Sequence, residues 1–198
     1  MNEKLNIGKW PENVMIVDAD YIGKVAFNLI VNFERMIGRR IPNADLAHWI
    51  DCIALDGGVR EGDQHTSVVF IHDKHQQQLQ NFQPASYQEE LHEKAFHDKL
   101  GEFMMYTLPV ESELVEKEEF LIDVVNTISN LKEVKRIMIV SDTDNGYDNL
   151  RHALRQVDEE KHVTVFAMQP LPGGNFKQEI LGFSLMSALG IQNSELNR

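Results

Sequence analysis

The chain has 198 residues, a formal net charge of −12 and a hydrophobic content of 42%. This length and composition are enough for one domain with a full core, so we expect residues 1–198 to form a single domain. The acidic balance argues against broad, non-specific binding to nucleic acid, but it allows a local basic groove. The single cysteine, Cys52, excludes a disulfide framework and a cysteine-based zinc site.

The N-terminus lacks a basic segment followed by an apolar one. No apolar run approaches the roughly 18 residues that a membrane span needs. A lone cysteine is also typical of a reducing compartment. These features predict a soluble, cytoplasmic protein.

The first regular element is a short apolar run at residues 14–17, Val-Met-Ile-Val. An apolar run without alternation is typical of a strand that is buried on both faces of a parallel sheet. Asp18 and Asp20 follow at once, and apolar residues at helical spacing then predict a helix over 22–37 that ends at Gly38. The sequence therefore predicts an acid-tipped strand followed by a helix.

The middle of the chain continues the alternation of helices and strands. We expect a helix over 46–54, a buried strand over 67–71 and a strand over 103–108. Ser86 with Glu89 resembles a capping box, which predicts a helix that ends at Gly101.

A His-Asp-Lys-His run at residues 72–75 follows the second strand. Neighbouring positions at a strand end point in different directions, and no further His or Cys spacing supports a zinc site. We therefore interpret His72 and His75 as surface-loop residues and Asp73 as a secondary candidate for an acidic edge.

A second acid-tipped strand lies at residues 137–140. It comes after a helix with a clean apolar stripe over 120–131 and is followed by Asp142, Asp144 and Asp148. Apolar residues at helical spacing over 147–157 then place these acids on a strand-to-helix turn. In open α/β sheets such turns, at the carboxyl ends of strands, bind ligands.

The last elements are a strand over 162–168 and a helix over 176–189 that is apolar around most of its circumference. A surface helix normally keeps a polar face, and soluble monomers rarely expose large apolar patches. We therefore predict a homodimer in which Leu181, Leu185 or Met186 crosses the interface.

The five strands, each followed by a helix, predict an α/β fold: a three-layer α/β/α sandwich with a five-stranded, mainly parallel sheet. The core spans about residues 14–168, and the C-terminal helix lies outside it. Parallel strands present their carboxyl ends at one edge, so Asp18, Asp20, Asp142 and Asp144 would converge if their strands are neighbours.

Four converging carboxylates repel one another, and two of them ~4 Å apart cost roughly 4 kcal/mol at an effective dielectric near 20. Either some stay protonated or a hard divalent cation, Mg²⁺ or Mn²⁺, neutralises them. A third interpretation gives the acids a structural role, because Asp is common in turns and at helix N-caps.

This pattern resembles the NYN branch of the PIN-like nuclease superfamily over roughly residues 14–168. The resemblance implies acids after the first strand, on the helix before the fourth strand and at the end of the fourth strand. The matching positions are Asp18 and Asp20, Asp123, and Asp142 with Asp144.

Through this resemblance we expect a metal-dependent ribonuclease. Asp18, Asp123, Asp142 and Asp144 would be catalytic, and Asp18, Asp20, Asp142 and Asp144 would bind Mg²⁺ or Mn²⁺, which activates water for phosphodiester hydrolysis. RNA would be the partner. Arginines at two places are the candidates for binding it: Arg39, Arg40, Arg151 and Arg155.

The sequence departs from the family pattern at Tyr21, Ser141 and Asn145, where members usually carry Asn, Gly and an aromatic residue. A degenerate, non-catalytic binding or scaffold protein is therefore one alternative. The other is a phosphatase of the haloacid dehalogenase type, in which Asp18 would be the nucleophile and Asp20 the general acid.

Overall fold

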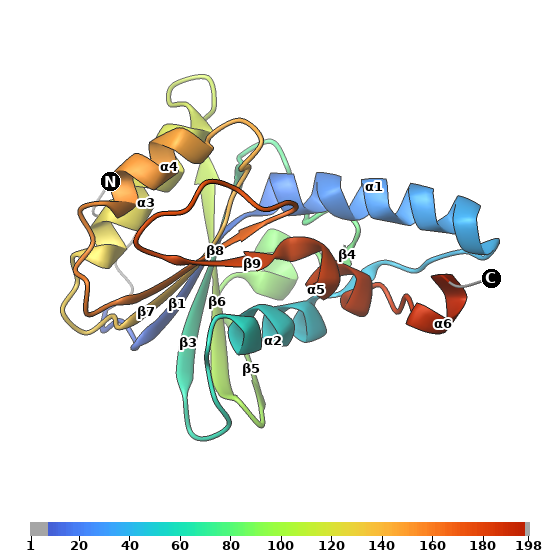
Figure 1. Cartoon of the computed structure of the whole chain (residues 1–198), viewed down its shortest axis with the longest axis horizontal. Coiled ribbons are helices and arrows are strands. Elements are labelled where there is room, and N and C mark those ends of the chain that lie inside the picture. Colours follow the sequence, from blue (N-terminus) through green and yellow to red (C-terminus); the bar gives the residue numbers. More distant parts are fainter. Residues whose placement is uncertain (1–7, 197–198) are drawn as a thin grey trace.

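The computed structural model describes residues 8–196 and shows an α/β protein built on a seven-stranded, mostly parallel sheet (Figure 1). The strand order is β5-β6-β3-β1-β7-β8-β9, and only β5 pairs antiparallel, with β6. A separate small sheet joins β2 to β4. The strands are β1 (Asn13–Asp18), β2 (Ala44–Asp45), β3 (His65–Asp73), β4 (Phe82–Gln83), β5 (Lys94–Asp98), β6 (Gly101–Val110), β7 (Arg136–Val140), β8 (His162–Ala167) and β9 (Lys177–Ile180).

Helices cover the main sheet on both faces (Figure 1). One hydrophobic core lies under α1, α2 and α5, and the other lies under α3 and α4. Within residues 8–196, no helix combines the length and the apolar character needed to cross a bilayer. The helices are α1 (Ala19–Ile37), α2 (Leu46–Asp56), the π-helix η1 (Tyr87–Leu91), α3 (Lys117–Ser129), α4 (Tyr147–Leu154), α5 (Leu181–Ala188) and α6 (Asn193–Leu196).

The centre of the sheet follows from the two apolar runs that the sequence singled out. In β1, Val14 and Ile16 face one core while Met15 and Val17 face the other, so a run without alternation is buried on both sides. β7 lies beside β1 in parallel. The prediction of an α/β fold with these two strands is confirmed.

The sheet is larger than predicted, because β5 and β9 extend it at its two edges. The expected helix from Ser86 to Gly101 is wrong. Ser86 does cap a helix, since its Oγ accepts a hydrogen bond from the Glu89 backbone N–H, but η1 ends after one turn. The chain then turns into β5, which is stabilised by pairing with β6 and by stacking of Phe96 on Phe103.

The expected final helix is also wrong over residues 176–180, where β9 forms beside β8. The helix begins only at Leu181, and the side chains of Leu181 and Leu185 are fully buried in the core of the same chain. These two residues therefore cannot cross an interface in the folded protein. The homodimer itself stays a prediction, and Phe183, with 71% of its surface exposed, is the apolar residue that α5 presents to solvent.

Candidate functional site

A pocket of about 310 Å³ opens between the carboxyl ends of β1 and β7. The chain builds β3 and β6 on one side of β1 and then crosses over to build β7, β8 and β9 on the other side. The crevice between β1 and β7 is thus the point where the strand order reverses, which is where open α/β sheets bind ligands. We call this cavity the carboxyl-edge pocket.

Three helices begin at this pocket: α1 directly after β1, α3 after β6 and α4 after β7. Asp18 is the N-cap of α1, and its side chain accepts a hydrogen bond of 3.0 Å from the Tyr21 N–H. A helix N-terminus carries a partial positive charge of about half a unit, so acidic side chains are favourable here. The charged lining residues are Asp18, Asp20, Lys24, Glu116, Lys117, Glu118 and Asp142.

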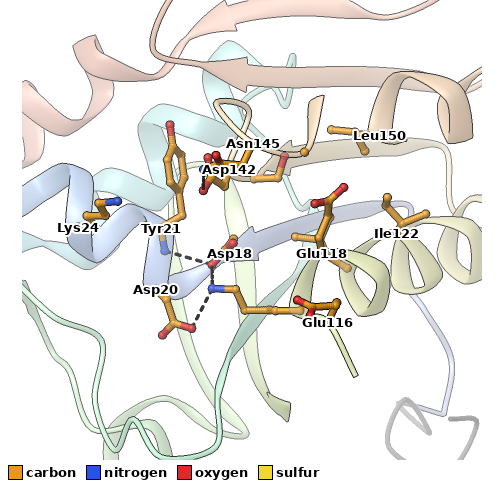
Figure 2. A pocket seen from close by; sticks show the side chains of 14 residues that line it. Asp18, Asp20, Tyr21, Lys24, Glu116, Glu118, Ile122, Asp142, Asn145 and Leu150 are labelled. Atoms are coloured by element: carbon orange, nitrogen blue, oxygen red, sulfur yellow. Dashed lines mark hydrogen bonds and ion pairs between the residues drawn. The ribbon is translucent and has the colours of Figure 1, made fainter. Parts of the chain in front are cut away.

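Lys117 forms ion pairs with two of these acids, which dashed lines mark at Asp18 and Asp20 in Figure 2. Its Nζ lies 2.9 Å from Asp18 Oδ1 and 3.0 Å from Asp20 Oδ2. Burial raises the pKa of Asp18, and the charge of Lys117 acts in the opposite direction. Burial lowers the pKa of Lys117, but the charges of Asp18 and Asp20 outweigh it and raise the pKa overall. A lysine of the chain itself therefore offsets one of the two charges of this acid pair, without a metal ion.

The remaining acids of the pocket have no such partner. Asp142 accepts hydrogen bonds from the Asp144 N–H at 3.1 Å and from Asn145 Nδ2 at 2.8 Å. Glu118 Oε1 accepts one from Asn149 Nδ2 at 2.7 Å. Within residues 8–196, no Lys, Arg or His nitrogen lies within 4.0 Å of the carboxylates of Asp142, Glu116 or Glu118. Figure 2 shows Glu118 and Asp142 on opposite sides of the cavity.

The structure brings together three of the predicted site residues, Asp18, Asp20 and Asp142, in this pocket. It does not bring Asp123 or Asp144 there, because both side chains are exposed and neither lines the cavity. The pocket is lined instead by Glu116, Lys117 and Glu118, which were not predicted from the sequence. Their position just before the apolar stripe of α3 placed them at a helix start, and this was the signal that could have found them.

The acids of the pocket fit a Mg²⁺ or Mn²⁺ ion only in the type of their ligand atoms. Carboxylate oxygens are the ligands that these ions prefer. However, the described part of the chain contains no group of three His, Cys, Asp or Glu side chains arranged to hold a metal, and Lys117 lies between Asp18 and Asp20. The residues as arranged do not fit a divalent ion, and the metal cofactor stays a prediction.

The four arginines proposed for RNA binding lie in two separate places. Arg39, at the end of α1, forms an ion pair of 2.7 Å with Glu195, and Arg40 is exposed beside it. Arg151 Nε donates to the Gly173 carbonyl, and Arg155 ends α4. The end of α1 and helix α4 lie at opposite ends of the molecule (Figure 1), so these arginines do not form one groove.

The expectation that His72 lies in a surface loop is wrong. Strand β3 continues to Asp73, and His72 is only 4% exposed. Its ring stacks on Tyr87 with 3.7 Å between centroids, and its Nδ1–H donates to the Asp73 carbonyl. Asp20 Oδ2 accepts a hydrogen bond from the Asp73 N–H, so Asp20 also fastens the end of β3 to the start of α1.

Comparison with known proteins changes the family assignment. A family model described as a family of unknown function (DUF6621) matches residues 7–196, and no NYN or PIN-like family model matches the chain. The resemblance to the NYN branch is therefore wrong as a family assignment. Neither the curated proteins nor the solved structures contain a match to the chain. The match over residues 7–196 identifies the chain as a member of the DUF6621 family.

Proposed function

We propose that the carboxyl-edge pocket binds a small ligand that carries a positively charged amine on an apolar body. The observation that carries this proposal is the set of three carboxylates without a cationic partner, Glu116, Glu118 and Asp142, in one cavity. The position of the pocket at the reversal of strand order supports a ligand site independently of its charge.

The balance of charge in the pocket favours a cation. Five carboxylates line it against two lysines, and the charge of one lysine, Lys117, is shared by Asp18 and Asp20. An anionic ligand would face repulsion from the remaining acids. An ammonium group about 4 Å from a carboxylate gains up to roughly 4 kcal/mol at an effective dielectric near 20, before the loss of its hydration.

The apolar part of the lining supports an apolar body on the ligand. Leu121 and Ile122 from α3 and Leu150 from α4 line the cavity beside the acids. A volume of about 310 Å³ is at the small end of ligand sites. Both features favour an amine with a short apolar chain or a single ring over a large substrate.

The ribonuclease and phosphatase hypotheses compete with this proposal for the same residues. The phosphatase needs Asp18 as a free nucleophile, whereas Asp18 Oδ1 is engaged by Tyr21 and Lys117 and the side chain is 7% exposed. The nuclease needs a divalent ion, which the acids do not fit while Lys117 lies between two of them. The amine proposal requires no rearrangement of these groups.

Isothermal titration with phenethylamine tests the proposal. We expect saturable binding that is weaker for 2-phenylethanol, which lacks the charge, and for ethylammonium, which lacks the ring. The double variant Glu116→Gln/Glu118→Gln should weaken binding roughly tenfold or more, because it removes two charges at the cavity. Glu119→Gln is the matched control, since Glu119 lies in the same helical turn but is exposed and does not line the pocket.

Titration with Mn²⁺ and cleavage assays test the competing hydrolase functions. If the protein binds Mn²⁺ but no amine, and cleaves RNA or p-nitrophenyl phosphate in a way that EDTA stops and Asp142→Asn abolishes, the hydrolase hypothesis replaces the amine proposal. Equal binding of phenethylamine and 2-phenylethanol would also contradict it, because charge would then contribute nothing.

A further inference from the structure

A second cavity, of about 480 Å³, lies at the opposite edge of the sheet, where the parallel strands begin. Arg136 is the first residue of β7 and pairs with His162, the first residue of β8. Lys177, the first residue of β9, pairs with Thr164. The loop after α2 completes the wall with Gly58 and Arg60. We call this cavity the amino-edge pocket.

The charged residues of the amino-edge pocket are all basic, although the whole chain carries a net charge of −12. Arg60, Arg136, Lys161 and Lys177 line it, and no Asp or Glu does. Lys177 has an ion pair of 2.6 Å with Glu179. For the other three, no carboxylate of the described chain lies within 4.0 Å.

Two of the lining cations, Arg60 and Arg136, lie close enough to repel each other. Burial lowers the pKa of Arg136, and the charge of Arg60 lowers it further. Burial also lowers the pKa of Lys161; Lys135, outside the cavity, adds to this effect, whereas Asp158 and Glu133 oppose it. Like charges held together in a concave site store repulsion that a bound anion relieves.

Helix capping explains part of this arrangement. Arg136 Nη1 donates to the Gly57 carbonyl at 2.8 Å and Lys177 Nζ to the Asp56 carbonyl at 3.1 Å, both at the C-terminus of α2. Lys161 Nζ donates to the Leu131 carbonyl, beyond the end of α3. However, carbonyl groups are neutral, and a helix C-terminus offsets only about half a unit of charge. Capping therefore leaves a net positive charge in the cavity.

Two further features give the cavity a specific shape. Gly58 has a φ of +94°, and a Cβ there would lie 2.6 Å from Arg136 Nη1, so the glycine makes room for the guanidinium. Phe176 lines the cavity with a partly exposed aromatic side chain. A planar guanidinium suits phosphate oxygens, and an aromatic ring suits a nucleobase.

We infer that the amino-edge pocket binds a nucleoside phosphate, with its phosphates on Arg60, Arg136 and Lys161 and its base against Phe176. A mononucleotide fits better than a nucleic-acid strand for two reasons. The cavity of about 480 Å³ has the size of a small-molecule site. A strand of many phosphates would also meet the field of a protein with a net charge of −12 beyond the pocket.

The test is titration calorimetry of the full chain with ADP, inorganic phosphate, adenosine and a short single-stranded RNA. We expect ADP to bind more tightly than phosphate or adenosine alone, and its affinity to fall as salt rises. If ADP binds no better than phosphate, the base site is wrong. If only the RNA binds, the surface recognises nucleic acid and the mononucleotide proposal is wrong.

Two variants separate binding from folding. Arg60 is exposed, so Arg60→Gln should leave the thermal unfolding temperature unchanged and weaken ADP binding roughly tenfold or more. Phe176→Leu should lower the affinity for ADP to that for phosphate. Arg40→Gln is the matched control, because Arg40 is an exposed arginine outside the cavity. Unchanged ADP binding in Arg60→Gln would overturn the proposal.

Discussion

Two pockets at opposite edges of one sheet carry opposite charge. At the carboxyl edge, five acids and two lysines line a pocket between β1 and β7. At the amino edge, Arg60, Arg136, Lys161 and Lys177 line a pocket without any acid. The net charge of −12 describes neither place, because it averages over both.

Helix direction accounts for this difference. Helices α1, α3 and α4 begin at the carboxyl edge, where their N-termini favour negative charge. Helix α2 ends at the amino edge, where Arg136 and Lys177 donate hydrogen bonds to its last carbonyls. In each pocket, the charge of the lining side chains is nevertheless larger than the partial charge of the helix ends. This excess charge makes both pockets candidates for ligand binding.

The largest expected effect comes from removing the lysine at the carboxyl edge. Lys117→Met leaves the buried Asp18 and its neighbour Asp20 without a cation, and breaking a largely buried ion pair costs about 3 kcal/mol in the free energy of unfolding at pH 7. Urea denaturation measures this loss. Lys24→Met is the matched control, because Lys24 lines the same pocket and forms no ion pair within residues 8–196.

The pH dependence of Lys117→Met has a definite sign. Burial already raises the pKa of Asp18 in the folded state, and without Lys117 it rises further. A raised pKa means that the protonated acid stabilises the fold and that this stability is lost as pH rises through the folded pKa. The difference from the natural chain should therefore be small near pH 4 and grow toward pH 7. A constant difference over this range would show that lost packing, not charge, causes the destabilisation.

A smaller effect is expected at the amino edge from Gly58→Ala. The new Cβ meets Arg136 Nη1, and a non-glycine residue at a φ of +94° is strained, so we expect a loss of about 2 kcal/mol and weaker ADP binding. Gly190→Ala is the matched control, with a φ of +68° and nothing within 4 Å of its Cβ position. If both variants lose the same free energy of unfolding, the close approach of Arg136 to Gly58 does not contribute to the destabilisation.

The smallest change in stability is expected from the acid pair Asp51 and Asp98. Burial and the neighbouring Asp98 carboxyl raise the pKa of Asp51 on α2 to about 7. The proton on Asp51 therefore stabilises the fold, and this contribution is lost as pH rises toward and through 7. Asp51→Asn should match the natural chain at pH 5 and exceed its stability at pH 8 by less than about 1 kcal/mol. A variant that is less stable at both pH values would contradict a shared proton.

Local sequence patterns were enough to predict the strands that frame the carboxyl edge. The apolar runs at 14–17 and 137–140 predicted β1 and β7, because a strand buried on both faces needs no polar alternation. Asp18, Asp20 and Asp142 were placed correctly at the strand ends for the same reason. The edge strands β5 and β9 escaped prediction, since their residues are half exposed and only pairing with β6 and β8 defines them.

Which charged side chains meet depends on the three-dimensional fold. Lys117 is 97 residues from Asp20 in the chain, and the crossover from β6 through α3 brings its ammonium between Asp18 and Asp20. Arg60, Arg136 and Lys161 are likewise distant in sequence and meet because parallel strands start at the same edge. Local pattern fixes which residues form a strand or helix, whereas long-range pairing of strands fixes their neighbours. The acidic and the basic pocket are both products of that pairing.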